Sequence, residues 1–229
     1  MAVRVYKRIS QEKLSEHFTV EDFACKDGSC EVPVSDELIC VLERLISLLR
    51  LSRIHIAAGY RTPSYAKRIG REKDIYHFDG RAADIICRDL RGNIVPSKTV
   101  LCALEGMGHK GGAAYISSQS VHVDVREKQE KYIETERGMK VNSFCKYFGM
   151  APVNPYNEPL SCLIKGSRGE GVKWLQTYLN GVGFCLETDG FFESKTLCAV
   201  KKFQELSGME PNGRVDILLR AALVSQVRG

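Results

Sequence analysis

Two histidines and one aspartate have the residue types and spacing of a metal site. Six residues separate His77 from Asp84, and His122 lies on a later segment in which apolar and polar residues alternate. A catalytic zinc ion takes three nitrogen or oxygen donors from the protein and keeps one position open for water, which it activates for hydrolysis. The glycine and alanines between the first two candidates would let the backbone turn and pack close to a metal. On these residues alone the alternative stays open that they are ordinary core or surface histidines, as we expect for His17 and His55.

Four motifs occur in one order along the first part of the chain. They are LSEHFTVEDFAC (14–25), GYR (59–61), HFDGRAAD (77–84) and VHVDVR (121–126). This series resembles the zinc D-Ala-D-Ala carboxypeptidase family, whose members are murein peptidases, over about residues 11–150. The resemblance implies that His77, Asp84 and His122 are zinc ligands. It also implies that Arg61 holds or polarises the carbonyl or carboxylate of the substrate, a role that suits a planar, permanently charged guanidinium.

Two positions depart from the family pattern and leave the proton acceptor unassigned. Ile75 stands where relatives usually carry serine, and Gln119 stands where some carry an acidic general base. Asp124 follows the last implied ligand by two residues on the same face of a strand. It is therefore a candidate catalytic residue that either contacts the reacting water or orients the ligand, and we favour the orienting role. Asp79 and His109 are the other polar candidates.

The elements around these residues predict an α+β domain over residues 1–150. Residues 35–51 have apolar side chains at helical spacing, with Ser35 in position to cap the helix, and a second helix is expected over residues 97–105. The predicted strands are residues 53–58, 82–87 and 120–126. With the resemblance, the expected fold of this zinc peptidase domain is a small antiparallel sheet with flanking helices.

A proline-rich segment separates this domain from a smaller one. Residues 151–160 (APVNPYNEPL) read as a linker, because proline interrupts helices and lacks the N–H donor that a sheet needs. Residues 161–229 contain three helical patterns, which predict a small three-helix all-α domain. These patterns cover residues 172–180, 194–206 and, more weakly, 216–224.

Three short motifs occur in order in the smaller domain: VKWLQ (172–176), DGFF (189–192) and AVKKFQ (199–204). By these motifs the domain resembles a peptidoglycan-binding domain, although Glu193 departs from that family, which prefers glycine there. Gln176 and Gln204 each close a helical motif. They are the candidate peptidoglycan-binding residues, although each could instead hydrogen-bond a loop. The implied task of the domain is to raise the concentration of the catalytic unit at its insoluble substrate.

Composition limits the partners and the compartment. The 229 residues carry a net charge of +5, which suits an acidic polymer but is too weak for a nucleic-acid-binding arm, and no apolar run is long enough to span a membrane. Nine cysteines without a CxxC motif favour free thiols and synthesis in a reducing compartment, with a disulfide or metal clip between Cys25 and Cys30 as the less supported alternative. Residues 1–13 are charged throughout, so we expect no classical signal peptide.

These observations predict a zinc-dependent peptidoglycan peptidase that hydrolyses D-Ala-containing stem or cross-link bonds. Whether it is a D,D-carboxypeptidase or an endopeptidase stays open, since loops around a site set specificity. We expect a monomer without nucleic-acid or membrane partners. Its expected role is that of a phage endolysin, made in the cytoplasm and acting at the bacterial cell wall. The alternatives are a bacterial autolysin and a catalytically silent protein that only binds the wall.

Overall fold

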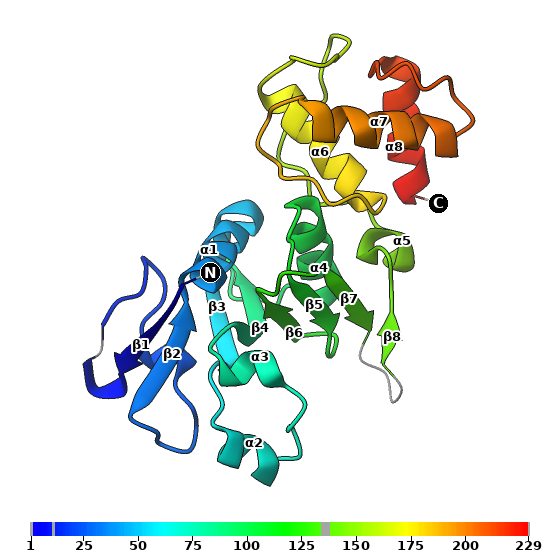
Figure 1. Ribbon diagram of the computed structural model, residues 1–229. Coiled ribbons are helices and arrows are strands. Elements are labelled where there is room, and N and C mark those ends of the chain that lie inside the picture. Colours follow the sequence, from blue (N-terminus) through cyan, green and yellow to red (C-terminus); the bar gives the residue numbers. More distant parts are fainter. Residues whose placement is uncertain (1, 11, 134–137, 229) are drawn as a thin grey trace. The chain divides into compact units, whose positions relative to one another are not determined.

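A computed structural model of the protein describes residues 2–10, 12–133 and 138–228 (Figure 1). The chain forms two compact units. The first comprises Met1–Val100 and Lys110–Lys140, and the second comprises Leu101–His109 and Val141–Gly229. The division falls inside helix α4 (Ser97–Gly106). Within the described residues, no helix has the length and apolar character needed to cross a membrane.

The first unit is built on a six-stranded sheet in the order β3-β4-β6-β5-β7-β8 (Figure 1). The strands are β3 (Leu51–Ala58), β4 (Ala82–Asp89), β5 (Gly112–Tyr115), β6 (Val121–Asp124), β7 (Glu130–Ile133) and β8 (Met139–Lys140). Neighbouring strands are antiparallel except β5 and β7, which run parallel. The predicted α+β fold is therefore confirmed, but the sheet is larger than expected and mixed.

A two-stranded sheet and a long helix lie before β3 in the chain. β1 (Val3–Lys7) pairs antiparallel with β2 (Glu31–Ser35), and α1 (Asp36–Leu49) begins directly afterwards. The helix buries its apolar face, and each fully buried leucine there contributes roughly 1.5–3 kcal/mol to the free energy of folding. Ser35 occupies the N-cap position as predicted, but its hydroxyl makes no capping hydrogen bond.

Short helices connect the strands of the first unit. They are η1 (Arg8–Ser10), η2 (Glu21–Phe23), α2 (Pro63–Arg68) and α3 (Ile75–Phe78). Thr62 caps α2, because its side chain accepts a hydrogen bond from the N–H of Tyr65 and Pro63 occupies the first turn. These segments have no long apolar period, and the pattern of apolar residues therefore did not predict them.

The second unit is helical. Its helices after α4 are α5 (Phe144–Phe148), α6 (Glu170–Gly181), α7 (Ser194–Leu206) and α8 (Ile217–Arg228). The last three confirm the predicted three-helix region, and their core is formed by buried side chains such as Trp174, Leu175, Phe203 and Leu223.

The proline-rich segment is part of the second unit and contacts its helices. Residues 151–160 contain no helix or strand. Pro152 is buried, the side-chain amide of Asn154 donates to the carbonyl of Trp174 (3.1 Å), and Glu158 pairs with Arg220 (3.0 Å). The bounds proposed from the sequence, a domain ending at residue 150 and another beginning at 161, stay a prediction.

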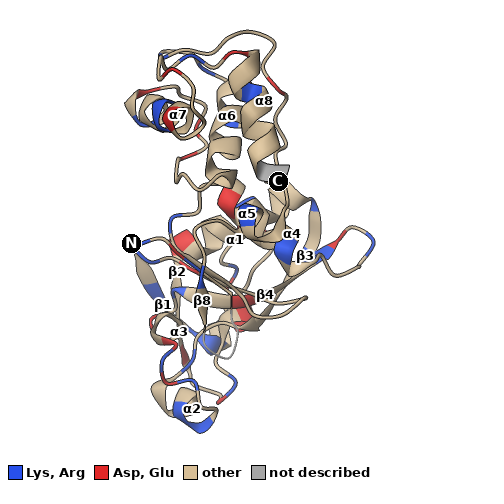
Figure 2. Ribbon diagram, turned by 90° about the vertical axis from the view of Figure 1, so that its right-hand side faces the viewer, with Lys and Arg blue, Asp and Glu red and all other residues tan. Residues whose placement is uncertain are grey.

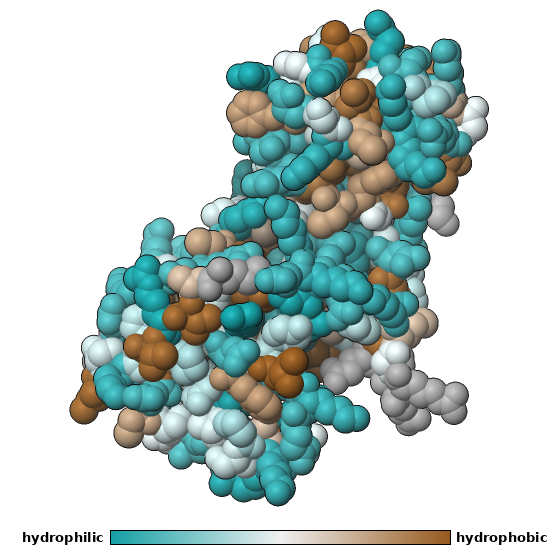
Figure 3. Space-filling view, in the orientation of Figure 1, coloured by the Kyte–Doolittle hydropathy of each residue, from teal (hydrophilic) through white to brown (hydrophobic). Residues whose placement is uncertain are grey.

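Charges and apolar side chains are distributed over the surface. In Figure 2, segments coloured for Lys and Arg lie between segments coloured for Asp and Glu. The face shown in Figure 3 carries several separate apolar patches on the first unit among hydrophilic side chains. Isolated apolar residues of this kind are ordinary for a folded protein.

All nine cysteines are free thiols in the structure, and their exposure predicts their reactivity. Five are exposed: Cys30, Cys40, Cys162, Cys185 and Cys198. Four are buried: Cys25, Cys87, Cys102 and Cys145. Burial raises the pKa of Cys87 to about 12, and a hydrogen bond with Cys102, together with burial, raises the pKa of Cys145.

We expect an alkylating reagent at pH 8 to modify the exposed set quickly and the buried set only after unfolding. The reason is that the thiolate is the reactive form and that a buried thiol is also inaccessible to the reagent. Mass spectrometry of the native and denatured protein measures both counts. A disulfide between Cys25 and Cys30 would contradict the expectation, because the denatured, unreduced protein would then take up two labels fewer.

Candidate metal centre

Three elements bring His77, Asp84 and His122 together. His77 is in α3, Asp84 is in β4 and His122 is in β6. The two strands are antiparallel neighbours, and Asp84 lies directly opposite His122 in their register. Side chains opposite each other in this way have Cβ atoms about 5 Å apart. The register of the sheet thus places two of the three candidate ligands.

The position of α3 depends on Gly80. This residue has a φ of +66°, and a Cβ atom there would overlap the backbone carbonyl of Pro33 in β2. The carbonyl of Gly80 accepts a hydrogen bond from the N–H of Ser35 (2.9 Å). A residue with a side chain would neither adopt this conformation readily nor allow this approach. Gly80 therefore fixes the short helix that carries His77.

The donor atoms of these three residues form a small triangle. Nε2 of His77 lies 3.3 Å from Nδ1 of His122 and 3.4 Å from Oδ1 of Asp84, and the latter two atoms are 2.9 Å apart. Ligands bound at about 2.0–2.1 Å around a tetrahedral zinc ion lie about 3.3 Å from one another. The three donors thus fit one face of such a tetrahedron.

The second nitrogen of each imidazole has its own partner. Nδ1 of His77 lies 2.6 Å from the carbonyl oxygen of Gly59, and Nε2 of His122 lies 3.1 Å from Oδ2 of Asp124. A carbonyl or a carboxylate only accepts, so each of these ring nitrogens carries the proton in a neutral imidazole. Nδ1 of His122 also faces a carboxylate, Oδ1 of Asp84 at 2.9 Å, and so carries a proton when no metal is bound. A metal in the triangle would replace that proton and take the lone pairs of Nδ1 of His122 and Nε2 of His77, the arrangement that metal-binding histidines use.

Asp124 lies behind His122 and away from the cleft described below. It is fully buried, and its carboxylate also accepts hydrogen bonds from the N–H of Gly112 (2.9 Å) and from the guanidinium of Arg126. These contacts and that with His122 keep the pKa of Asp124 below its usual range, against the effect of burial. The position favours the orienting role and gives no support to contact between Asp124 and the reacting water.

Arg61 is tied to the same group. One terminal nitrogen lies 2.7 Å from Oδ2 of Asp74 and the other lies 2.6 Å from Oδ2 of Asp84. The residue is 7% exposed. Because both terminal nitrogens bind carboxylates of the protein, the geometry makes Arg61 a positioning residue for Asp84. The substrate-binding role that the resemblance implied stays a prediction.

The charges around His77, Asp84 and His122, which we call the triad, favour a bound cation. Burial opposes ionisation of Asp84, but hydrogen bonds and charge from His122 and His77 hold the pKa of this carboxyl well below its usual range. Burial likewise disfavours the charged form of His122, but its hydrogen bonds to Asp124 and Asp84 outweigh that effect and raise its pKa to about 9. Two carboxylates therefore surround the ring of His122 with negative charge.

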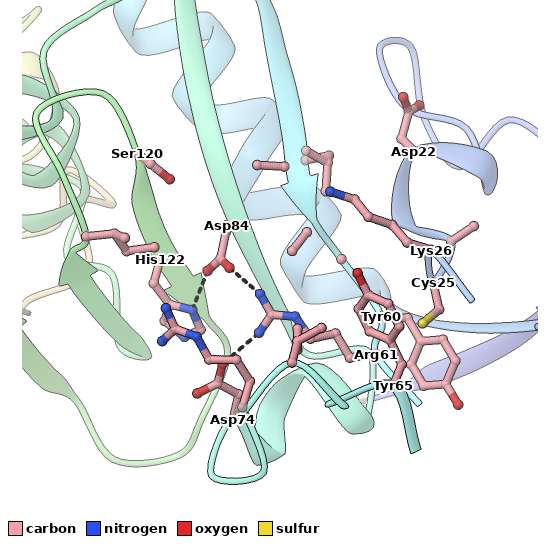
Figure 4. Close-up of a pocket in the computed structure, with 18 of the residues that line it drawn as sticks. Asp22, Cys25, Lys26, Tyr60, Arg61, Tyr65, Asp74, Asp84, Ser120 and His122 are labelled. Carbon is pink, nitrogen blue, oxygen red and sulfur yellow. Dashed lines mark hydrogen bonds and ion pairs between the residues drawn. The ribbon is translucent and has the colours of Figure 1, made fainter. Parts of the chain in front are cut away.

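The triad lies in a cleft of about 1050 Å³ in the first unit (Figure 4). Five strands contribute lining residues: Ala58 (β3), Asp84 (β4), His122 (β6), Ala114 (β5) and Tyr132 (β7). These strands are consecutive in the sheet, so the cleft crosses it with Asp84 and His122 in the middle. At about 4.8 Å per strand, the span is about 19 Å.

Comparison with known proteins identifies both parts of the chain. Residues 16–124 match the family model described as Peptidase M15, and residues 168–223 match that of a peptidoglycan binding domain. The chain joins a Peptidase M15 domain to a peptidoglycan-binding domain. No curated protein matches it. M15 peptidases are zinc-dependent, and the His-Asp-His triangle is a group that could bind that metal. Together the two domains support a zinc peptidoglycan hydrolase.

Several polar residues of the M15 domain lie elsewhere than the sequence suggested. Gln119 and Asp79 are exposed and His109 is buried, and none of the three lines the cleft. His55, which we had placed with the ordinary histidines, does line it. Asp74 is a cleft residue that the motifs gave no reason to select; its carboxylate binds Arg61, and its backbone carbonyl accepts a hydrogen bond from the N–H of His77.

The two glutamines of the peptidoglycan-binding domain hold loops. The amide nitrogen of Gln176 donates to Asp189 (2.8 Å) and its oxygen accepts from the N–H of Gly190 (2.9 Å). Gln204 repeats this pattern with Asn212 and Gly213, each at 2.9 Å. Both side chains are almost fully buried. The structure thus favours the loop-bonding alternative, and the peptidoglycan-binding role of these glutamines stays a prediction.

Proposed function

We propose that the protein is a zinc-dependent endopeptidase that hydrolyses D-Ala-containing bonds within the stem or cross-link peptides of peptidoglycan. The observation that carries this proposal is the place of Asp84 and His122 midway along the cleft. An enzyme that removes one terminal residue needs little space beyond the scissile bond. Here the cleft continues past the triad over β5 and β7, which leaves room for peptide on both sides of the bond.

The roles of the residues follow from their contacts. When bound by His77, Asp84 and His122, zinc supplies a Lewis acid that polarises the scissile carbonyl and activates water. The carbonyl of Gly59 and the carboxylate of Asp124 keep the two imidazoles in the metal-binding tautomer.

Arg61 and Asp74 also have roles in the proposed reaction. The ion pair of Arg61 with Asp84 favours the ionised carboxylate and fixes the orientation of this ligand. Asp74 is the cleft carboxylate that shares Arg61 with Asp84, and it is our candidate for the proton acceptor.

The nine free thiols bear on the biological role. They fit a protein made in a reducing compartment. A phage endolysin, synthesised in the host cytoplasm before it reaches the wall, meets that condition, and we propose this role. The peptidoglycan-binding domain would then keep the peptidase close to its polymeric substrate.

Mass spectrometry of muropeptides tests the activity. Purified cell walls of several chemotypes are incubated with the protein, with the protein and a chelator, and with chelator followed by added zinc. We expect new amino and carboxyl ends inside stem or bridge peptides, lost with the chelator and restored by zinc.

Two results would contradict the proposal in different ways. Loss of only the terminal D-alanine mass would identify a D,D-carboxypeptidase. Unchanged muropeptides, with the protein still sedimenting with the walls, would identify a protein that binds peptidoglycan without cleaving it.

A further inference from the structure

The acidic side chains of the cleft all have partners. Within the described residues that line it, the acids are Glu21, Asp22, Asp74 and Asp84. Glu21 pairs with Arg8 (2.6 Å), and Asp74 and Asp84 share Arg61. Asp22 accepts hydrogen bonds from the backbone and hydroxyl of Thr19, both at 2.8 Å. These carboxylates are therefore already held by groups of the protein.

Two basic side chains on the β3 side of the cleft, unlike its acidic side chains, have no partner within the described residues. The side chains of Lys26 and Arg53 line the cleft and are exposed, and neither makes an ion pair or side-chain hydrogen bond with any residue that the structure describes. Asp27, next to Lys26 in sequence, binds the hydroxyl of Thr62 and the N–H of Ser29 instead. This side of the cleft thus carries positive charge that no described group of the protein neutralises.

Lys26 and Arg53 lie at different positions relative to the candidate metal ligands. In Figure 4 the amine of Lys26 points toward β3 and the side of the cleft that holds Asp84, whereas the carboxylate of Asp22 points away from it. Arg53 lies near the start of β3, five residues before Ala58, which pairs with Asp84. At about 3.3 Å per residue, Arg53 is about 17 Å along the strand from the triad. A peptide of about five extended residues spans that distance.

Arg61 is not available to bind a negatively charged group of a substrate, which leaves that task to other cations of the cleft. Both terminal nitrogens of Arg61 bind Asp74 and Asp84, and the residue is almost fully buried. A negatively charged group of a substrate would therefore find its cation elsewhere in the cleft. Lys26 is exposed in the cleft and its amine points toward β3, on the side that holds Asp84, so it can meet such a group without breaking an existing ion pair.

We propose that Lys26, with Arg53 further along β3, binds carboxylate groups of the substrate peptide and so selects acidic over amidated stem peptides. This inference rests on the proposed function, since it names the form of peptidoglycan peptide that the cleft takes. A stem peptide offers such a choice because its free carboxyl groups can be replaced by carboxamides of the same shape. A lysine close to one of these positions attracts the charged form and gains little from the amide.

Two synthetic cross-linked stem peptides test the inference, one with free carboxyl groups and one with the same groups amidated. The kcat/KM for each is measured with the full-length wild type and the Lys26→Gln, Arg53→Gln and Lys98→Gln variants. Lys98 is exposed on α4 and does not line the cleft, so its variant controls for the loss of one charge. Binding of both peptides to chelator-treated protein is measured by calorimetry, which reads affinity without turnover.

We expect the wild type and Lys98→Gln to prefer the acidic peptide and Lys26→Gln to lose about tenfold of that preference in both readouts. Arg53→Gln should lose less of the preference for the acidic peptide, because the substrate carboxylate that Arg53 would bind lies further from the scissile bond. Hydrolysis of both peptides with a preference that Lys26→Gln leaves unchanged would overturn the inference while the proposed function stands. Binding that prefers the acidic peptide and depends on Lys26, without hydrolysis of either peptide, would instead overturn the proposed function and support the inference.

Discussion

His122→Ala should abolish both zinc binding and peptidoglycan hydrolysis. The substitution removes one of three donors whose mutual distances are 2.9–3.4 Å, while the backbone pairing of β4 and β6 is kept. Two remaining donors do not make a catalytic zinc site, which takes three from the protein. Because the metal supplies several kcal/mol of transition-state stabilisation, turnover should fall by roughly a thousandfold or more. His77→Ala and Asp84→Ala should have the same effect.

The measurement pairs zinc content after equilibrium dialysis with release of new amino ends from cell walls. His17→Ala is the matched control, because His17 is a histidine of the same domain that pairs with Glu43 outside the cleft. It should keep both zinc and activity. Undiminished turnover in any of the three ligand variants, with the fold checked by circular dichroism, would refute the assignment of the metal centre.

The candidate ligands could be selected from sequence because their spacing is local and their motifs are in order. His77 and Asp84 are separated by one turn, fixed by Gly80, and His122 lies on a strand whose alternation is visible in the sequence. What the pattern did not contain was the register of β4 against β6. That register places Asp84 opposite His122, and it forms only when the sheet assembles.

Residues whose roles depend on distant partners were harder to predict. The resemblance implied that Arg61 binds substrate, which stays a prediction. Its ion pairs with Asp84 and with Asp74, which belongs to no motif, could not be predicted from the sequence. The sequence left open whether Gln176 and Gln204 contact peptidoglycan or bind a loop, and the loop N–H groups that their amide oxygens accept from are known only from the structure. A side chain's polar partners decide between binding and structure, and such partners are rarely adjacent in sequence.

The sheet was underestimated for a related reason. β5 has the sequence GAAY and β8 has two residues, so neither shows the alternation of large apolar side chains that indicates a strand. The small residues of β5 serve the site instead. A Cβ atom on Gly112 would approach the side chain of Arg126, so glycine leaves the space that the Asp124–Arg126 pair occupies.

Asp124→Asn should weaken zinc binding by about 10-fold to 100-fold while the fold persists. The amide has the same shape, and Arg126 keeps Glu130 as a partner. What is lost is the negative charge 3.1 Å from Nε2 of His122, which fixes the tautomer and makes Nδ1 a better donor to the metal. The zinc dissociation constant, measured by competition with a chelating dye, should therefore rise, and activity should recover when zinc is added in excess.

The Asp74→Asn variant is the control that distinguishes the loss of zinc affinity in Asp124→Asn from a general loss of negative charge in the domain. The Asp74 side chain lies in the cleft and binds Arg61, and the contact of this residue with His77 is made by its backbone carbonyl, which accepts from the N–H of His77 (3.0 Å) and is kept in asparagine. The zinc affinity of Asp74→Asn should therefore match that of the wild type. If Asp124 acted on the reacting water instead of the ligand, excess zinc would not restore the Asp124→Asn variant, and its zinc affinity would be unchanged. The buried position of Asp124 behind the ring of His122 is the reason to expect the opposite result.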